Sequence, residues 1–327
     1  MEKYLEPKKS NGFLQYIDFQ GHSPFIYAEA QRRLILHRDT IIKLCADGMA
    51  HHFVADEDRI IDLDEVDTCK VEPGKDYYIY LVSDGLDIVI TDDPKTPYNW
   101  RKIGGFHTLC ADVGEIKGHP LSGYKAGDIL PNSVWCLNHR SAGLQDGMVY
   151  DPARDEWVMI YLQSGTGKET QSKFGARPTT RRNWYDTVDD MTAVGCRLLD
   201  ETGFMSAMEG SPIGVNIKDS SCPATTGGHT ATNGQRIISN IGVEDGVGVL
   251  WQWLENQGYD KGSWDSLDVG KGKVYSADGS DSGQLAGGDW SDGSYCGSRA
   301  RNAVSSRSSV LVACGGRGRS RCFHFAK

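Results

Sequence analysis

The C-terminal stretch of residues 287–327 decides the fold of this chain. It opens on Gly287-Gly288-Asp289-Trp290, continues through Gly297-Ser298-Arg299-Ala300-Arg301 and closes on Gly315-Gly316-Arg317-Gly318. Glycine and arginine recur where a backbone must turn or be held, because glycine tolerates positive φ and arginine donates several hydrogen bonds. The residues between these clusters follow neither helical nor strand periodicity. This pattern is typical of long loops that present side chains at a surface.

Composition and charge narrow the class of protein. The length of 327 residues favours two domains, and 39 glycines with 8 tryptophans are typical of a loop-rich fold with large anchoring side chains. A formal net charge of −9 argues against a nucleic-acid binder. The N-terminus has no apolar signal-peptide core, and no uncharged apolar run is long enough to span a bilayer. We therefore expect cytoplasmic synthesis, no membrane insertion and no nucleic-acid partner.

The order of signals along the chain predicts an α+β protein. Residues 1–12 are polar and are predicted to be a flexible arm. Residues 13–115 contain short β-branched runs and a clear hairpin around Asp84-Gly85, which predicts a small all-β domain. A boundary is expected near Gly114–Gly127, with a second domain over residues 120–327.

The second domain is predicted to hold two helices and small sheets. One helix carries Trp184, Val188 and Met191 at helical spacing, and Asp200 is the expected N-cap of the other. Alternation of Val247, Val249, Trp251 and Trp253 predicts a core strand, and the Gly/Ser/Asp-rich residues 258–288 predict a long surface loop.

Candidate catalytic and metal-binding motifs are weak. Gly165-Thr166-Gly167-Lys168 lacks the residues that a phosphate loop needs on either side. Cys136 and His139 are three residues apart, but a buried cysteine beside a loop-bonding histidine is the favoured interpretation, and His51-His52 has no partner at metal-ligand spacing.

Two further features leave alternatives open. Glu244 and Asp245 offer oxygen ligands to a structural calcium ion, or else accept backbone N–H bonds in a turn. The nine cysteines are odd in number and widely spaced, which predicts mostly reduced, buried thiols rather than a disulfide framework.

Two segments carry a resemblance to a known family. Residues 239–253, with Gly242, Asp245, Gly246, Trp251 and Trp253, resemble the signature of the formylglycine-generating-enzyme type of C-type lectin fold. The clusters Gly-Gly-x-Trp, Gly-Ser-Arg-Ala and Gly-x-Arg-Gly of residues 287–318 resemble the variable region of diversity-generating retroelement proteins. The resemblance covers residues 120–327 and implies a C-type lectin-like domain with small antiparallel sheets, two helices and long loops.

The resemblance also implies how the variable region, residues 287–327, is divided. In this family, template adenines are copied with errors, so Asn codons give a mixture of residue types. The candidate variable, ligand-binding positions are Asp289, Ser291, Asp292, Tyr295, Val304, Ser305, Ser309, Leu311 and Ala313. The candidate scaffold residues are Gly288, Trp290, Gly297, Ser298, Arg299, Gly315, Arg317 and Gly318. Among these, we expect Trp290 to hold the backbone by burial and Arg299 by forked hydrogen bonds to carbonyls.

The function that the resemblance implies is non-enzymatic receptor binding. Residues 76–82 and 101–106 resemble β modules of phage tail-fibre proteins that trimerise. We therefore expect a tropism-determining protein in a virion tail fibre, a homotrimer that binds a host-surface protein or glycan and contacts other tail proteins. One alternative is an exported cellular display protein of the same retroelement class. The other is a formylglycine-generating enzyme using Cys314 and Cys322, which the loss of Asn and Glu from the tryptophan signature disfavours.

Overall fold

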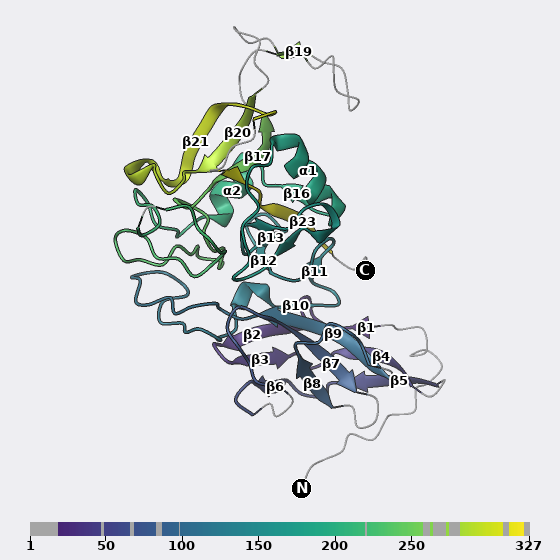
Figure 1. The fold of residues 1–327 in the computed structure, drawn as a ribbon. Helices are drawn as coiled ribbons and strands as arrows, with labels where there is room; N and C mark the ends of the chain where they lie inside the picture. The colour runs from purple at the N-terminus through teal and green to yellow at the C-terminus, as the bar shows by residue number, and fades with distance from the viewer. Residues whose placement is uncertain are drawn as a thin grey trace. The chain divides into compact units, whose positions relative to one another are not determined.

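The computed structural model describes residues 19–46, 49–65, 69–82, 87–97, 99–219, 221–257, 262–263, 273–274, 282–309 and 314–323 (Figure 1). The chain forms two compact units, one from Met1–Ala111, Tyr124–Arg140 and Phe323–Lys327, the other from Asp112–Gly123 and Ser141–Cys322. The first unit thus includes Tyr124–Arg140, which begin within the segment Gly114–Gly127 where a boundary was predicted. In the described part of the chain, no helix has the length and apolar character needed to cross a membrane.

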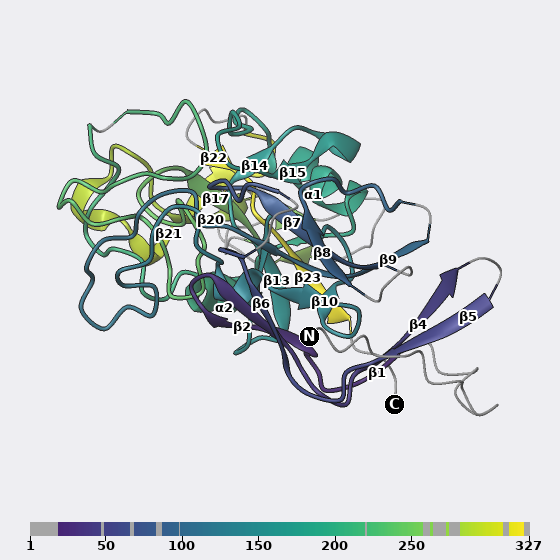
Figure 2. The same ribbon diagram turned by 90° about the horizontal axis from the view of Figure 1, so that it is seen from below.

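The described part of the first unit is built from strands and one 3₁₀ turn, η2 (Pro131–Ser133). Its strands are β1 (Phe19–Gln20), β2 (Ile26–Ala30), β3 (Arg33–Leu36), β4 (Ile41–Ala46), β5 (Met49–Val54), β6 (Arg59–Asp62), β7 (Asp76–Val82), β8 (Ile88–Thr91), β9 (Trp100–His107) and β10 (Trp135–Cys136). They form three antiparallel sheets with the orders β1-β4-β5, β2-β3-β6 and β10-β9-β7-β8. Figure 2 shows β4 and β5 as a long paired ribbon.

The core of the first unit follows from β-branched and aromatic strand residues. Leu34, Ile79 and Ile103 are fully buried and belong to one apolar cluster. The predicted hairpin is present as β7 paired with β8, although its Asp-Gly turn lies outside the described residues. A side chain at Gly105 would approach the Tyr77 carbonyl oxygen to 2.6 Å and the Trp135 ring nitrogen to 2.7 Å. Glycine at this position therefore lets the indole pack against β9.

The second unit combines two helices with short strands. Its helices are α1 (Trp184–Ala193) and α2 (Glu201–Ala207), with 3₁₀ turns η3 (Gly167–Glu169) and η4 (Gly293–Tyr295). Its strands are β11 (Arg140–Ser141), β12 (Met148–Asp151), β13 (Glu156–Met159), β14 (Gln163–Ser164), β15 (Gln171–Ser172), β16 (Arg197–Leu198), β17 (Trp251–Gln257), β18 (Gly262–Ser263), β19 (Lys273–Val274), β20 (Ser282–Gly287), β21 (Gly297–Ser306), β22 (Cys314–Gly315) and β23 (Gly318–Phe323). The α+β prediction, small antiparallel sheets with two helices, is confirmed.

Two sheets organise this unit. One has the order β11-β23-β13-β12, with β16 also paired to β23. The other has the order β21-β20-β17-β22, in which β17 and β22 run parallel and the other pairs are antiparallel. The segment after residue 287 therefore contributes β21 and β22 to one sheet and β23 to the other. The C-terminal stretch is therefore an integral part of both sheets.

Both helices begin at a side-chain cap, and the cap of α2 is the predicted one. Asn183 caps α1 by accepting a hydrogen bond from the Asp186 amide at 2.8 Å. Asp200 caps α2 by accepting one from the Gly203 amide at 2.6 Å. These caps satisfy amide groups that have no partner inside the helix, so a local signal is sufficient to start each helix.

One strand prediction and one loop prediction are wrong in extent. Val247 and Val249 are fully buried, but β17 begins only at Trp251. The reason is Gly248, whose φ of +67° interrupts extended geometry. Residues 258–288 were expected to form one surface loop, yet residues 282–287 form β20, which lies between β17 and β21 and is buried throughout.

Candidate ligand-binding face

The turn between β20 and β21 is the tip of the C-terminal stretch. Gly287 and Gly288 have φ of +97° and +82°, so the chain reverses there with no Cβ to oppose it. A side chain at Gly288 would approach the Cys296 sulfur to 2.8 Å. The buried Cys296 therefore packs on the glycine and closes the loop that includes η4. Burial, with the charges of Asp292 and Asp289, raises the pKa of its thiol to about 12.

Three candidate variable positions form a local hydrogen-bonded turn. The Asp289 carboxylate accepts hydrogen bonds from the Ser291 amide at 2.8 Å and the Ser291 hydroxyl at 2.7 Å. The Asp289 amide donates to the Asp292 carboxylate at 2.8 Å. Asp289 is buried, Asp292 is half-buried and Ser291 is exposed. Of these three, Ser291 is the position whose side chain is exposed to solvent.

A groove with a volume of about 950 Å³ lies beside this turn. It is lined by Met205, Ser206, Met208, Glu209, Gly210, Ser211, Ile213, Ser294, Tyr295, Cys296, Gly297, Ser298, Arg299 and Ala300. One wall comes from α2 and the loop that follows it, and the other from η4 and the start of β21. A hydrogen bond of 2.9 Å from the Gly214 amide to the Cys296 carbonyl oxygen joins the two walls. We call this feature the Tyr295 groove.

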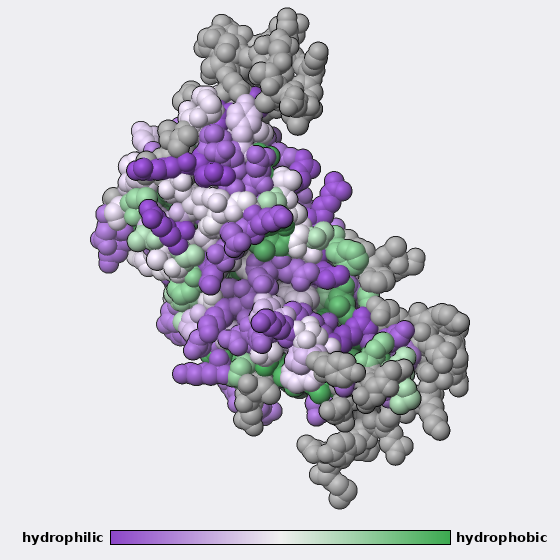
Figure 3. All heavy atoms as spheres, turned by 45° about the vertical axis from the view of Figure 1, so that its right-hand side comes forward, coloured by the Kyte–Doolittle hydropathy of each residue, from purple (hydrophilic) through white to green (hydrophobic). Residues whose placement is uncertain are grey.

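The Tyr295 groove concentrates exposed apolar surface. Tyr295 is 82% exposed and Ile213 is 81% exposed. Within the described part of the second unit, these are the two large hydrophobic side chains left in solvent, and both line this groove. Figure 3 shows a face that is mostly hydrophilic with small apolar patches. Exposed apolar side chains gathered in a groove are typical of a binding surface, and tyrosine gives contact area at low ordering cost.

Two of the remaining candidate variable positions, Ser305 and Ser309, are not among the residues that line the groove. Ser305 lies in β21 opposite Gly283 and is half-buried, as is Ser309. The backbone of Val304 belongs to β21, but its side chain is outside the described residues. Leu311 and Ala313 also lie outside them. Among the predicted positions, Tyr295 lines the groove and Ser291 stands in the preceding turn.

Arg317 is the candidate scaffold residue with the clearest structural role. It is 1% exposed, and its guanidinium donates to the carbonyl oxygens of Met159 at 2.7 Å and Ile160 at 2.6 Å. It also donates to the Glu244 carbonyl oxygen at 2.6 Å and the Gln252 side chain at 2.8 Å. Burial lowers the pKa of Arg317 to about 10, opposed by Asp245 and Glu244. The arginine therefore ties the C-terminal stretch to β13, to the Glu244 loop and to β17.

The glycines around Arg317 are required by close packing. A side chain at Gly318 would approach the Met191 sulfur to 2.6 Å, and one at Gly316 would approach the Gln163 side-chain oxygen to 2.3 Å. Gly315 is buried beside Leu250. Packing of this density leaves no room for a Cβ at Gly316 or Gly318 without movement of a neighbour.

The predicted roles of Trp290 and Arg299 differ from what the structure has. Trp290 is half-buried, and its carbonyl oxygen accepts a hydrogen bond from the Asn216 side chain. Arg299 is exposed and lines the Tyr295 groove. The carbonyls of Ser298 and Ala300 are instead held at 2.9 Å by Arg301. Sequence context alone cannot distinguish Arg299 from Arg301, because residues two apart in a strand point to the same side. Which of the two arginines is shielded from solvent depends on the packing of α2 against β21.

Arg301 and Gly297 complete the support of this tip. The Arg301 guanidinium lies 5.4 Å from the centre of the Phe204 ring, which belongs to α2. Gly297 is buried, and a side chain there would be 3.9 Å from Ile213. The start of β21 is thus held against α2, while Arg299 and Tyr295 face solvent.

Glu244 and Asp245 form a buried hydrogen-bond network. Glu244 accepts from Arg236 at 2.6 Å and from the Gly228 amide at 3.2 Å. Asp245 accepts from the Gly227 amide at 2.6 Å and pairs with His229 at 2.9 Å. All four carboxylate oxygens therefore have protein partners. Two of these partners are backbone amides, as in the backbone-bonding alternative, and the other two are the side chains of Arg236 and His229. In the described part of the chain, no group of three His, Cys, Asp or Glu residues is arranged to hold a metal ion.

His229 is electrostatically coupled to this network. Burial alone would lower the pKa of His229, but the hydrogen bond and charge of Asp245, with the charge of Glu244, raise it overall. Protonated His229 thus balances part of the buried negative charge.

The weaker catalytic candidates have structural explanations. Cys136 is fully buried, donates to the Asn138 side chain at 3.1 Å, and exchanges two backbone hydrogen bonds of 2.9 Å with His139. Burial raises the pKa of the Cys136 thiol to about 11, which disfavours a nucleophile. Cys322 accepts a hydrogen bond from the Trp157 ring nitrogen at 3.4 Å, and the side chain of Cys314 lies outside the described residues.

The two remaining sequence motifs lie in ordinary structural surroundings. His51 and His52 lie on β5, which pairs with β4, and His52 is buried. In the glycine-rich segment, the Gly167 amide donates to the Asp190 carboxylate at 2.7 Å, which leaves a carboxylate where a phosphate loop would place its anion.

Two functional residues were missed by sequence reasoning. Ile213 lines the groove, and its signal was an apolar residue between Pro212 and Gly214 in a loop. Gln252 stands where the lectin-type signature has Glu, and it accepts from Arg317 while donating to the Gly246 carbonyl oxygen at 2.8 Å. That departure from the signature preserves an acceptor for the buried arginine.

Comparison with known proteins gives one consistent result. Residues 24–136 match the family model described as Mtd second domain. The structure titled Major Tropism Determinant U1 Variant matches with a TM-score of 0.73 and 21% identity, covering 98% of this chain and 87% of that chain. The M1 Variant matches with a TM-score of 0.72, 20% identity and the same coverage. No curated protein sequence matches the chain. The predicted resemblance is confirmed as similarity to the tropism determinant, with its C-type lectin-like fold.

Proposed function

We propose that this chain is a non-enzymatic receptor-binding protein that determines tropism through the tip formed by residues 288–300. The observation that carries the proposal is the full-length likeness to structures titled Major Tropism Determinant. The placement of Tyr295 and Ile213 in an exposed groove on a rigid support agrees with it. A host-surface protein or glycan is the proposed partner.

The division between support and surface favours an exchangeable binding face. Arg317, Gly316 and Gly318 are buried by contacts that leave little freedom, whereas Ser291, Tyr295 and Arg299 are exposed. Replacing an exposed side chain costs little stability, so a diversifying process could act there without loss of the fold. We propose retroelement copying as that process.

The DNA that follows the coding sequence tests diversification. We expect a near-copy of the codons for residues 287–327 that differs almost solely at adenines, accompanied by a reverse-transcriptase gene. Absence of such a repeat would refute diversification while leaving receptor binding open.

We further propose a homotrimer in a virion tail fibre, in contact with other tail proteins. Small binding sites gain strength from repeated display, which favours an oligomer. Sedimentation equilibrium on the purified chain should give three times the mass of 36.0 kDa. A monomer at micromolar concentration would contradict this assembly.

Adsorption distinguishes receptor binding from a purely structural role. The purified chain should bind cells of the host that the parent phage infects and should compete with the phage for adsorption. Tyr295→Ala should reduce that competition, whereas Arg321→Ala, on the exposed end of β23, should not. Equal competition by both variants would exclude the Tyr295 groove as the contact.

A further inference from the structure

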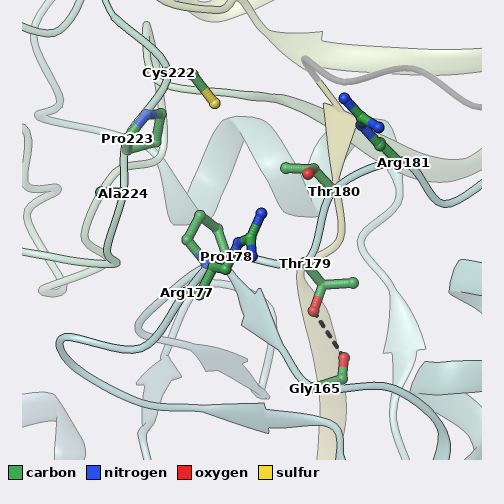
Figure 4. A pocket seen from close by; sticks show the side chains of 9 residues that line it. All are labelled: Gly165, Arg177, Pro178, Thr179, Thr180, Arg181, Cys222, Pro223 and Ala224. Atoms are coloured by element: carbon green, nitrogen blue, oxygen red, sulfur yellow. Dashed lines mark hydrogen bonds between the residues drawn. The ribbon is translucent and has the colours of Figure 1, made fainter.

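A second pocket of about 870 Å³ lies in the loops that precede α1 and follow Asp219 (Figure 4). Its lining residues are Gly165, Arg177, Pro178, Thr179, Thr180, Arg181, Cys222, Pro223 and Ala224. Figure 4 shows the Arg177 guanidinium, the Thr180 side chain and the Cys222 thiol turned toward the middle of the pocket, with Arg181 at its edge. None of these residues is among the candidate variable positions.

Two arginines, Arg177 and Arg181, bring positive charge to the pocket lining. Arg177 and Arg181 are both exposed, and in the described part of the chain neither forms an ion pair. The adjacent Arg182 behaves differently, since it pairs with Asp190 at 2.8 Å and Asp186 at 3.7 Å. The carboxylates of α1 therefore neutralise Arg182 and leave the two pocket arginines available for a ligand.

The backbone beneath these arginines is held in place. The Thr179 amide donates to the Gln163 carbonyl oxygen at 2.7 Å, and its hydroxyl donates to the Gly165 carbonyl oxygen at 2.8 Å. Arg181 adopts a left-handed φ of +60°, which is uncommon for arginine and persists only where surrounding contacts hold it. The backbone on this side of the pocket is therefore held by specific contacts.

The pKa of the Cys222 thiol is affected by charges around the pocket. Burial raises the pKa of its thiol, the charge of Asp289 adds to this, and the charge of Arg177 opposes it. The Arg177 charge thus reaches the thiol across the pocket. Asp289 is buried, its carboxylate accepts hydrogen bonds from Ser291, and it is not among the residues that line the pocket.

We propose that this pocket binds an oxyanion, a carboxylate, sulfate or phosphate group, between Arg177 and Arg181 with the Thr180 hydroxyl as a further donor. The planar guanidinium fork matches the oxygens of such groups, and two unpaired arginines give charge-assisted hydrogen bonds. The proposal goes beyond receptor binding at the Tyr295 groove and stands without it. It assigns an anion site to residues outside the set expected to vary.

Calorimetric titration of the full chain with sodium sulfate, phosphate and acetate, at constant ionic strength against chloride, tests the proposal. At least one oxyanion should bind saturably at millimolar concentration or below. Arg177→Gln and Arg181→Gln should each weaken binding at least tenfold, and Arg→Lys at either position should weaken it less. The matched control Arg321→Gln should bind as the unaltered chain does.

Alkylation supplies a second readout that does not depend on the variants. Iodoacetamide labelling followed by peptide mapping should show slower modification of Cys222 when the oxyanion is bound, because the ligand covers the thiol and disfavours the thiolate. Cys45, the exposed thiol of the first unit, should react at an unchanged rate. Unsaturable titrations, or equal slowing at Cys222 and Cys45, would overturn the proposal.

Discussion

Removal of the Arg317 guanidinium is expected to cause the largest loss of stability of any single change in the C-terminal stretch. Arg317→Met keeps the apolar part of the side chain but removes all four hydrogen bonds, to the carbonyls of Met159, Ile160 and Glu244 and to Gln252. The Ile160 carbonyl oxygen still accepts a hydrogen bond of 2.8 Å from the Glu244 amide. Each of the other three buried acceptors loses its arginine donor at a cost of at least about 1 kcal/mol, which gives about 3 kcal/mol.

The assay is urea or thermal unfolding of the full chain, followed by the signal of the second unit. For a unit of this size, each kcal/mol lowers Tm by about 2–4 °C, which gives a fall of about 6–12 °C. Arg321→Met is the matched control, because Arg321 is exposed on β23, the strand that begins directly after Arg317, and its loss should change stability by less than about 0.5 kcal/mol. A loss below about 1 kcal/mol for Arg317→Met would refute the scaffold role.

Three further outcomes are expected. Tyr295→Ala should leave Tm within the error of the unaltered chain, because the side chain is 82% exposed, and a large fall would show that it is part of the core. The free energy of unfolding should fall as pH rises through the pKa of His229, because that pKa is raised in the folded state. The stabilisation is complete below the pKa of the unfolded state, about 6.5, and is lost as pH rises past the pKa of the folded state. His229→Gln should remove that dependence in a pH series of urea titrations. Millimolar calcium or EDTA should leave Tm unchanged, because hydrogen bonds already occupy the oxygens of Glu244 and Asp245, and a calcium-dependent rise would establish a cation site.

Local signals in the sequence predicted the helices well. In both helices, the capping side chain lies three residues before the amide that it binds. Both partners of the hydrogen bond are therefore visible in a short segment of sequence. The β7–β8 hairpin is likewise local. Its two strand-forming runs lie on either side of Asp84-Gly85, a residue pair typical of hairpin turns, so neighbouring residues alone predict the pairing.

Long-range packing explains what the sequence could not predict. Residues 282–287, Ser-Gly-Gln-Leu-Ala-Gly, have little strand character, and they form β20 because β17 and β21 pair with them on both sides. Similarly, Arg299 and Arg317 both follow Gly-Ser or Gly-Gly, yet one is exposed and the other buried. The carbonyl groups that accept hydrogen bonds from Arg317 belong to residues about 70 to 160 positions away in the sequence.

The candidate site was predicted in part for the same reason. Tyr295 lies on the predicted tip, but the opposite wall, including Ile213, comes from the loop after α2, which no spacing in the C-terminal stretch indicates. Asp289 was expected at the surface, and its burial arises from the turn that it forms with Ser291 and Asp292.

The most direct measurement is selection from a displayed library of the full chain randomised at Ser291, Ser294, Tyr295 and Arg299. If these exposed positions form an exchangeable face on a fixed support, most members should fold and different members should bind each of two unrelated target proteins. A library randomised at Gly316, Arg317, Gly318 and Gln252 should yield few folded members. Loss of folding in the first library to the same extent as in the second would contradict the account.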